Sequence, residues 1–176
     1  MKSNIRKIIA VLSIAIVAIA LCLCLAVYND PVNKVRRMLN SESYSSVVDY
    51  YNKLTLGSKK EKIDTLISTK VDDAYTSWYE QEIDYDNAVT AIEPFSSIDN
   101  QEIKGVADSH LSLMTIEHTG DEERKKAETF FSDGDFLNAM LCRQNVDPSY
   151  SSYEKLSSIY DDRKIRVNHF WCGVNT

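Results

Sequence analysis

The sequence is poor in the residues that interrupt helices, with three prolines and five glycines among 176 residues. It also lacks any convincing run in which apolar and polar residues alternate, the pattern of a half-buried strand. Apolar residues instead recur at spacings of three and four, most clearly between Ile63 and Tyr79. These absences exclude an extensive sheet, and the spacing predicts an all-α fold.

Cysteine and histidine are scarce as well. Two of the four cysteines lie in an apolar stretch near the amino end, so only Cys142 and Cys172 remain and a disulfide framework is excluded. Whether these two pair, or Cys142 is buried in a helix, stays open. His110 and His118 are eight residues apart, about 12 Å along a helix, which is too far to share a metal ion.

Motifs for catalysis are missing too. The sequence has no Gly-x-Ser-x-Gly nucleophile motif and no glycine-rich phosphate loop, and its acidic pairs lack the EF-hand pattern. Acidic pairs such as Asp72-Asp73 and Asp84-x-Asp86 are typical of a solvated helix face. We therefore expect a protein that is not an enzyme, with no catalytic residues, no metal site and no cofactor.

The amino-terminal residues have the composition of a membrane anchor. Residues 1–7 carry three basic side chains and no acid, and residues 8–28 contain Ser13 as their only clearly polar member. At about 1.5 Å per residue this run reaches about 30 Å, the thickness of a bilayer core, whereas the core of a signal peptide has roughly 7–15 residues. We predict a transmembrane signal-anchor at residues 8–28, with cleavage near Ala26 as the alternative.

The basic amino end also predicts the orientation of the chain. We expect residues 1–7 in the cytoplasm and residues 29–166 outside it, as the helical domain of a single-pass protein of the cell membrane. The opposite flank carries three basic residues as well, so the charge bias is small. Residues 167–176 form an apolar tail; either Phe170 and Trp171 fold back over the last hairpin, or the chain is shorter than its relatives.

The part of the chain after the apolar run is acidic. Asp30–Thr176 contains 17 Lys and Arg against 26 Asp and Glu, a net charge of −9. Because such a surface repels phosphate groups, we expect no nucleic-acid partner.

Turn-forming and helix-capping residues divide this acidic part into short helices. The predicted helices are 32–39, 44–54, 59–83, 85–95, 101–118, 121–132, 136–146 and 149–160.

Three stretches of the chain superimpose when Tyr44, Tyr85 and Phe136 are aligned. In each one a polar N-cap candidate precedes the aromatic residue, and apolar residues follow at plus three and plus four. A further apolar residue lies six positions upstream, on the preceding helix. The repeated unit is therefore a helix, a tight turn and a second helix.

The third copy, SDGDFLNAM at residues 132–140, is the most complete. Gly134 permits the left-handed backbone that reverses a chain at a helix end. Asp135 can accept hydrogen bonds from the free amides of the next helix, and Ala139 lets the two helices approach closely. The string is thus typical of a helical hairpin.

This third copy resembles the tetratricopeptide repeat. The residues that fall at that family's relative spacings are Ala127, Phe130, Gly134, Phe136 and Ala139. The resemblance implies antiparallel helix pairs. The copies at Tyr44 and Tyr85 lack the glycine, and the aromatic residues are 41 and 51 residues apart, longer than the family's period, so the repeats are imperfect.

Most of the extramembrane part, Asn33–Tyr153, is also similar to uncharacterised envelope proteins of Gram-positive bacteria. The shared features are an amino-terminal membrane helix, an Asn-Lys-Val-like helix after it, and Tyr-x-x-Ala helix pairs that end in Asp-Pro-x-Tyr. The resemblance implies a surface-anchored helical repeat domain and carries no activity.

Ten tyrosines are more than helix propensity would select. Tyrosine provides large contact area at low entropic cost, so Tyr150 and Tyr153 are candidate partner-binding residues, although repeat packing also favours aromatics. We expect a non-enzymatic protein that binds a protein or peptide partner at the cell envelope. The alternatives are a self-assembling structural spacer of the envelope and a membrane scaffold that faces the cytoplasm.

Overall fold

The computed structural model describes residues 2–157 except 56, 58 and 155, with side chains from residue 12 onward. This part of the chain is helical and contains no strand, which confirms the all-α fold. The expectations for the apolar tail, for Cys172 and for the end of the helix predicted at 149–160 fall outside the described residues. The predicted start of that helix was wrong, because residues 149–152 form turns, beginning where the Asp147 carboxylate accepts a hydrogen bond from the Ser149 amide.

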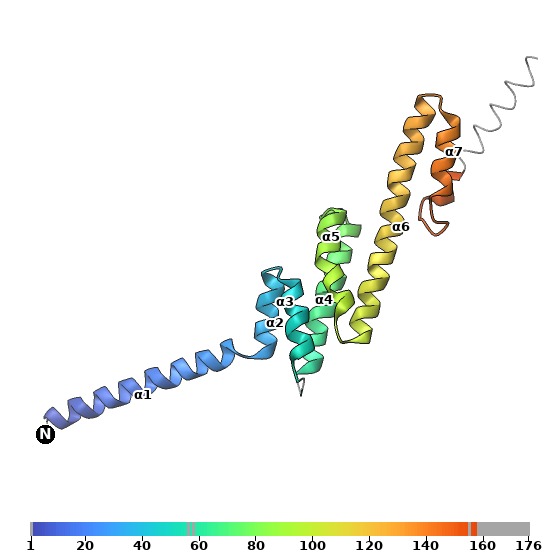
Figure 1. The fold of residues 1–176 in the computed structure, drawn as a ribbon. Helices are drawn as coiled ribbons and strands as arrows, with labels where there is room; N and C mark the ends of the chain where they lie inside the picture. The colour runs from blue at the N-terminus through green and yellow to red at the C-terminus, as the bar shows by residue number, and fades with distance from the viewer. Residues whose placement is uncertain (1, 56, 58, 155, 158–176) are drawn as a thin grey trace, which may run out of the picture.

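Seven α-helices and one 3-10 helix follow one another in the described part (Figure 1). They are α1 (Lys2–Tyr28), α2 (Pro31–Asn40), α3 (Tyr44–Lys53), α4 (Lys60–Tyr79), α5 (Tyr85–Ile92), η1 (Glu93–Ser97), α6 (Gln101–Ser132) and α7 (Phe136–Gln144).

The first hydrophobic core lies among α2, α3, α4, α5, η1 and the amino-terminal half of α6. Each helix contributes apolar residues at helical spacing, as Ile63, Ile67 and Val71 do on α4. The largest fully buried side chains are Val35, Val47, Ile63, Ile67, Val71, Ile92, Phe95, Ile103 and Met114. This core therefore includes helices from both halves of the described chain.

A second, smaller core lies between α7 and the carboxyl-terminal half of α6 (Figure 1). Its buried residues are Ala127, Phe131, Ala139, Cys142, Val146, Tyr150 and Leu156. α6 thus passes from one core to the other as a single helix of 32 residues.

We expected α6 to be two helices that break at Gly120, and this was wrong. The backbone stays helical through Gly120, which is buried beneath the ring of Tyr150. A Cβ atom at this position would lie 2.4 Å from Cδ2 of Tyr150. The glycine therefore makes room for a tyrosine, and its conformational freedom is not used.

Two other helices end three or more residues before their predicted limits. α4 ends at Tyr79 and does not reach residue 83, because Gln81 has a φ of 63° and turns the chain. α5 ends at Ile92 and continues as a 3-10 turn through Pro94, which has no backbone N–H to continue the helix.

α1 projects away from the bundle and belongs to neither core (Figure 1). Its apolar side chains from Leu12 to Val27 are exposed, Ile14 by 70%. No single helix in the described part is both long enough and apolar enough to cross a membrane. Leu12–Tyr28 and Pro31–Asn40 reach that length and apolarity only as a pair, and the two are bent by 63° where they meet.

Candidate binding site

The residues of the first two repeat copies lie in and beside the first core. Tyr44 is buried, with its ring edge-on to Phe95 at 6.0 Å between centroids. Tyr85 is half-buried and stacks on His118 of α6, with 4.0 Å between ring centroids and 6° between planes. No pattern in the sequence indicated this second contact, because it joins residues of two separate helices.

The residues of the third copy form the α6–α7 hairpin. Gly134 has a φ of 78°, and the Asp135 carboxylate accepts a hydrogen bond from the Asn138 amide at 3.2 Å. Ala127 and Ala139 are both buried in the second core. Phe130 packs against this core, whereas Phe136 is 44% exposed with its ring 6.0 Å from that of Phe131.

Tyr150 was expected to face a partner, and the structure corrects this. The ring is 3% exposed because it covers Gly120, and its hydroxyl donates to the Asp121 carboxylate at 2.5 Å. Its contact area is therefore used within the chain. Tyr153 is half-buried against the second core, and its contact with a partner stays a prediction.

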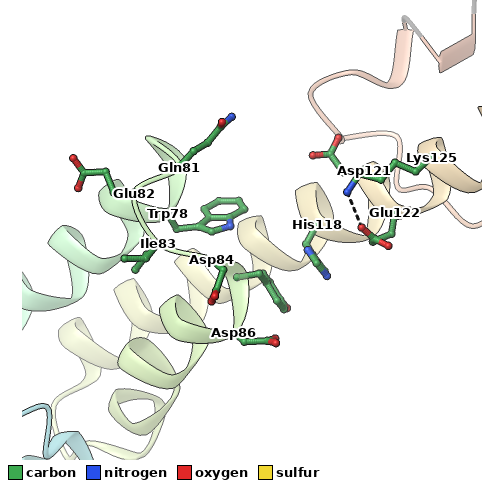
Figure 2. Close-up of a pocket in the computed structure, with 11 residues that line it drawn as sticks. Trp78, Gln81, Glu82, Ile83, Asp84, Asp86, His118, Asp121, Glu122 and Lys125 are labelled. Atoms are coloured by element: carbon green, nitrogen blue, oxygen red, sulfur yellow. Dashed lines mark hydrogen bonds and ion pairs between the residues drawn. The ribbon is translucent and has the colours of Figure 1, made fainter.

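An open cleft of about 580 Å³ lies where α6 leaves the first core (Figure 2). The turn between α4 and α5 forms one side, and the middle of α6 forms the other. The lining residues are Trp78, Gln81, Glu82, Ile83, Asp84, Tyr85, Asp86, His118, Asp121, Glu122 and Lys125. We refer to these eleven residues as the α4–α6 cleft.

Local rules of chain folding position the α4 side of this cleft. Gln81 reverses the chain in the left-handed region, and the Asp84 carboxylate caps α5 by accepting from the Asn87 amide at 2.8 Å. The Glu82 carboxylate accepts from the Ser77 hydroxyl at 3.0 Å. These bonds hold a short acidic turn against the indole of Trp78, which Figure 2 shows at the same side of the cleft.

Contacts between α5 and α6, and one ion pair within α6, position the opposite side. The Tyr85 ring stacks on His118, and the Tyr85 and Thr115 hydroxyls are 3.2 Å apart. Lys125 donates to the Glu122 carboxylate at 2.9 Å, and this bond holds the pKa of Glu122 below its ordinary value. The cleft therefore has fixed aromatic surfaces from both of its sides.

The lining carries an excess of negative charge. Five carboxylates face one ammonium group, that of Lys125, which leaves a net charge of −4 with His118 neutral. Each carboxylate has two oxygens, and each hydrogen bond described above involves only one oxygen of its carboxylate. The other oxygens remain as acceptors for a ligand. Aromatic faces beside carboxylates suit cationic side chains, which combine ion pairing with cation–π contact.

Two other hollows in the described part lack an exposed aromatic face beside their carboxylates. One of about 400 Å³ lies between α4 and α5 and has the buried Tyr44 as its aromatic residue. One of about 620 Å³ lies along α4 near Asn100 and is lined by polar and aliphatic side chains without an aromatic ring.

No group of three or more His, Cys, Asp or Glu side chains within the described residues is arranged to hold a metal ion. Cys142, the thiol of the second core, is buried, and burial raises its pKa, with the nearby Glu123 adding to the effect. A raised pKa disfavours the thiolate that nucleophilic chemistry needs.

The sequence did not identify the cleft as a site. We interpreted its acids as a solvated helix face, since the spacing of Asp84 and Asp86 alone carries no further signal. The chain matches no protein-family model, and comparisons with curated proteins and with solved structures find no similar protein. The interpretation of function therefore depends on this chain's own residues.

Proposed function

We propose that this protein is a membrane-anchored, non-enzymatic helical repeat protein that binds a protein or peptide partner at the cell envelope. The observation that carries the proposal is the α4–α6 cleft. It is open to solvent, it joins two helix pairs, and its aromatic and acidic lining suits a partner segment that bears Lys or Arg.

Successive contacts between helices support the repeat interpretation. α2 packs against α3, α4 against α5, and α6 against α7, so three helix pairs follow one another along the chain. This order agrees with the imperfect tetratricopeptide-like units proposed from the sequence. In stacked helix pairs, the surfaces between neighbouring pairs are the usual binding surfaces, which favours the cleft as the partner site.

Exposure along α1 supports the anchor. α2 buries Val35 and Leu39 in the first core, so it belongs to the folded domain. The preceding apolar side chains from Leu12 to Val27 are covered by nothing in the described part. A bilayer would remove this apolar surface from water. The domain is proposed to lie outside the cytoplasm, as the basic residues 1–7 suggest.

Site-specific photo-crosslinking in membranes tests the partner site. A photoreactive residue replaces Gln81, which is exposed in the cleft, or Gln101, which is exposed on α6 outside it. We expect a crosslinked product of defined mass from position 81 only. Asp86→Lys should abolish it, whereas Asp49→Lys on α3 should not. A product of equal yield from both positions would count against the cleft.

A second candidate function, self-assembly into a structural spacer, is favoured by the outer surface of α7. Four large apolar side chains lie there at helical spacing: Phe136, Leu137, Met140 and Leu141, exposed by 44–71%. A photoreactive residue at position 137 distinguishes the two functions. A homodimeric product would favour self-assembly, and its absence beside a product from position 81 would favour partner binding.

A further inference from the structure

Charge is distributed unevenly along the part of the chain that follows α1. Residues 30–60 carry six Lys and Arg against three Asp and Glu, a net charge of +3. Residues 61–176 carry 11 against 23, a net charge of −12. The segment that directly follows the proposed anchor is therefore basic, whereas the rest of the domain is acidic.

The fold brings these basic residues to one end of the first core. Lys59, just before α4, forms an ion pair with Asp30 at the α1–α2 junction. Lys60 donates to the Tyr51 hydroxyl at 3.0 Å, which holds the carboxyl end of α3, with Lys53, beside the start of α4. Figure 1 shows the amino ends of α2 and α4 at the same end of the bundle.

The junction between α1 and α2 is held by side chains. Asn33 donates to the Val27 carbonyl at 3.0 Å, and Arg37 donates to the Tyr28 carbonyl at 2.8 Å. The Arg37 guanidinium also lies 3.9 Å from the centre of the Tyr28 ring. These bonds satisfy carbonyls at the end of α1 that the helix leaves free. They also fix α2 close to the end of the apolar helix.

A tyrosine at the end of an apolar helix, followed by basic residues, is the arrangement found where a protein leaves a bilayer. Lys and Arg at this level attract anionic headgroups over about one Debye length. We propose that the basic end, defined as Lys34, Arg36, Arg37, Lys53 and Lys59, binds the headgroups of anionic phospholipids and docks the domain on the membrane surface. This inference rests on the proposed function, because it requires α1 to be inserted.

Hydrogen exchange of the full chain in lipid nanodiscs tests the docking. One set of discs contains phosphatidylcholine only, and the other includes phosphatidylglycerol. We expect amides at the α1–α2 junction and in the first turn of α4 to exchange roughly fivefold more slowly in the anionic discs. A basic residue near an anionic surface contributes about 1 kcal/mol, which corresponds to this fivefold change. Roughly 1 M salt, with a Debye length of about 3 Å, should remove the difference.

Charge variants provide the matched control. Arg36→Glu with Lys53→Glu should abolish the effect of phosphatidylglycerol, since both side chains are exposed at the basic end. Lys104→Glu with Arg143→Glu makes the same change of charge on α6 and α7, outside both the basic end and the α4–α6 cleft, and should preserve it. Equal exchange in the two kinds of disc would overturn the inference while leaving the anchor intact. A chain that does not enter either disc would instead overturn the proposed anchor.

Discussion

Three side-chain contacts hold the segment after α7 against α6. The Tyr150 hydroxyl donates to Asp121, the Ser151 hydroxyl donates to Glu117 at 2.6 Å, and the Asn145 amide donates to Glu123 at 3.2 Å. Glu123 is only 8% exposed, so its charge needs the hydrogen bonds from Asn145 and Lys126. The position of this segment therefore depends on polar residues as well as on the second core.

Substitution of two glycines in α6 separates packing from helix propensity. Gly105→Ala should stabilise the protein by up to about 1 kcal/mol, because nothing lies within 4 Å of the added Cβ and alanine favours helix. Gly120→Ala should destabilise it, since overpacking against Tyr150 typically costs about 1–3 kcal/mol. Chemical denaturation in detergent measures both. Stabilisation by Gly120→Ala would show that the Tyr150 ring does not occupy this position.

Ionisation of Glu123 makes the free energy of unfolding depend on pH in the acid range. Lys126 donates to its carboxylate at 2.6 Å and lowers its pKa in the folded state, with Asn145 adding to the effect. A lowered folded pKa contributes stability above the unfolded value, about 4.3, and this contribution is lost as the pH falls through the folded pKa. Denaturation at a series of pH values should show Glu123→Gln less stable than the original chain near pH 7, with a gap that narrows toward pH 3.

At the scale of single elements, the α6–α7 hairpin depends on close helix approach. Ala139→Leu should destabilise the protein by about 1–3 kcal/mol, because the Ala139 side chain is completely buried. Asn138→Leu, at an exposed neighbouring position, should cost no more than about 1 kcal/mol, which includes its lost bond to Asp135. Thermal unfolding of the two variants measures the difference. Equal effects would contradict the hairpin packing.

Sequence patterns predicted those elements that local chemistry determines. The turn at Gly134 and the capping aspartates Asp84 and Asp135 follow from residue type alone, and these three residues have the predicted roles. Gly120 shows the limit of this reasoning. A glycine before an acid looked like a helix end, but a tyrosine 30 positions later decides its role. Gln81 is the converse case, a non-glycine residue in a left-handed turn.

At the scale of the whole molecule, the cleft could not be predicted for the same reason. Trp78 and His118 are 40 positions apart, and the sequence gives no rule for which turn of α6 faces the end of α4. The stacking of His118 on Tyr85 is likewise a contact between elements. Composition predicted the helices and the apolar amino end, whereas the relative placement of the helices required the structure.

The two cores share α6, and among the described helices α7 packs principally on it. They should therefore open separately. Hydrogen exchange of the full chain should show faster opening of α7 than of α4, because the second core buries fewer large side chains. Ala139→Leu should accelerate exchange in α7 and leave α4 unchanged. Equal acceleration in both helices would indicate one cooperative unit.

The continuity of α6 has a mechanical consequence. Its 32 residues extend about 48 Å at 1.5 Å per residue, and the helix connects the two cores in series. A pulling force applied between α1 and α7 would load both cores equally, and the weaker one would yield first. The second core would then act as an extensible element, while the first core kept its shape.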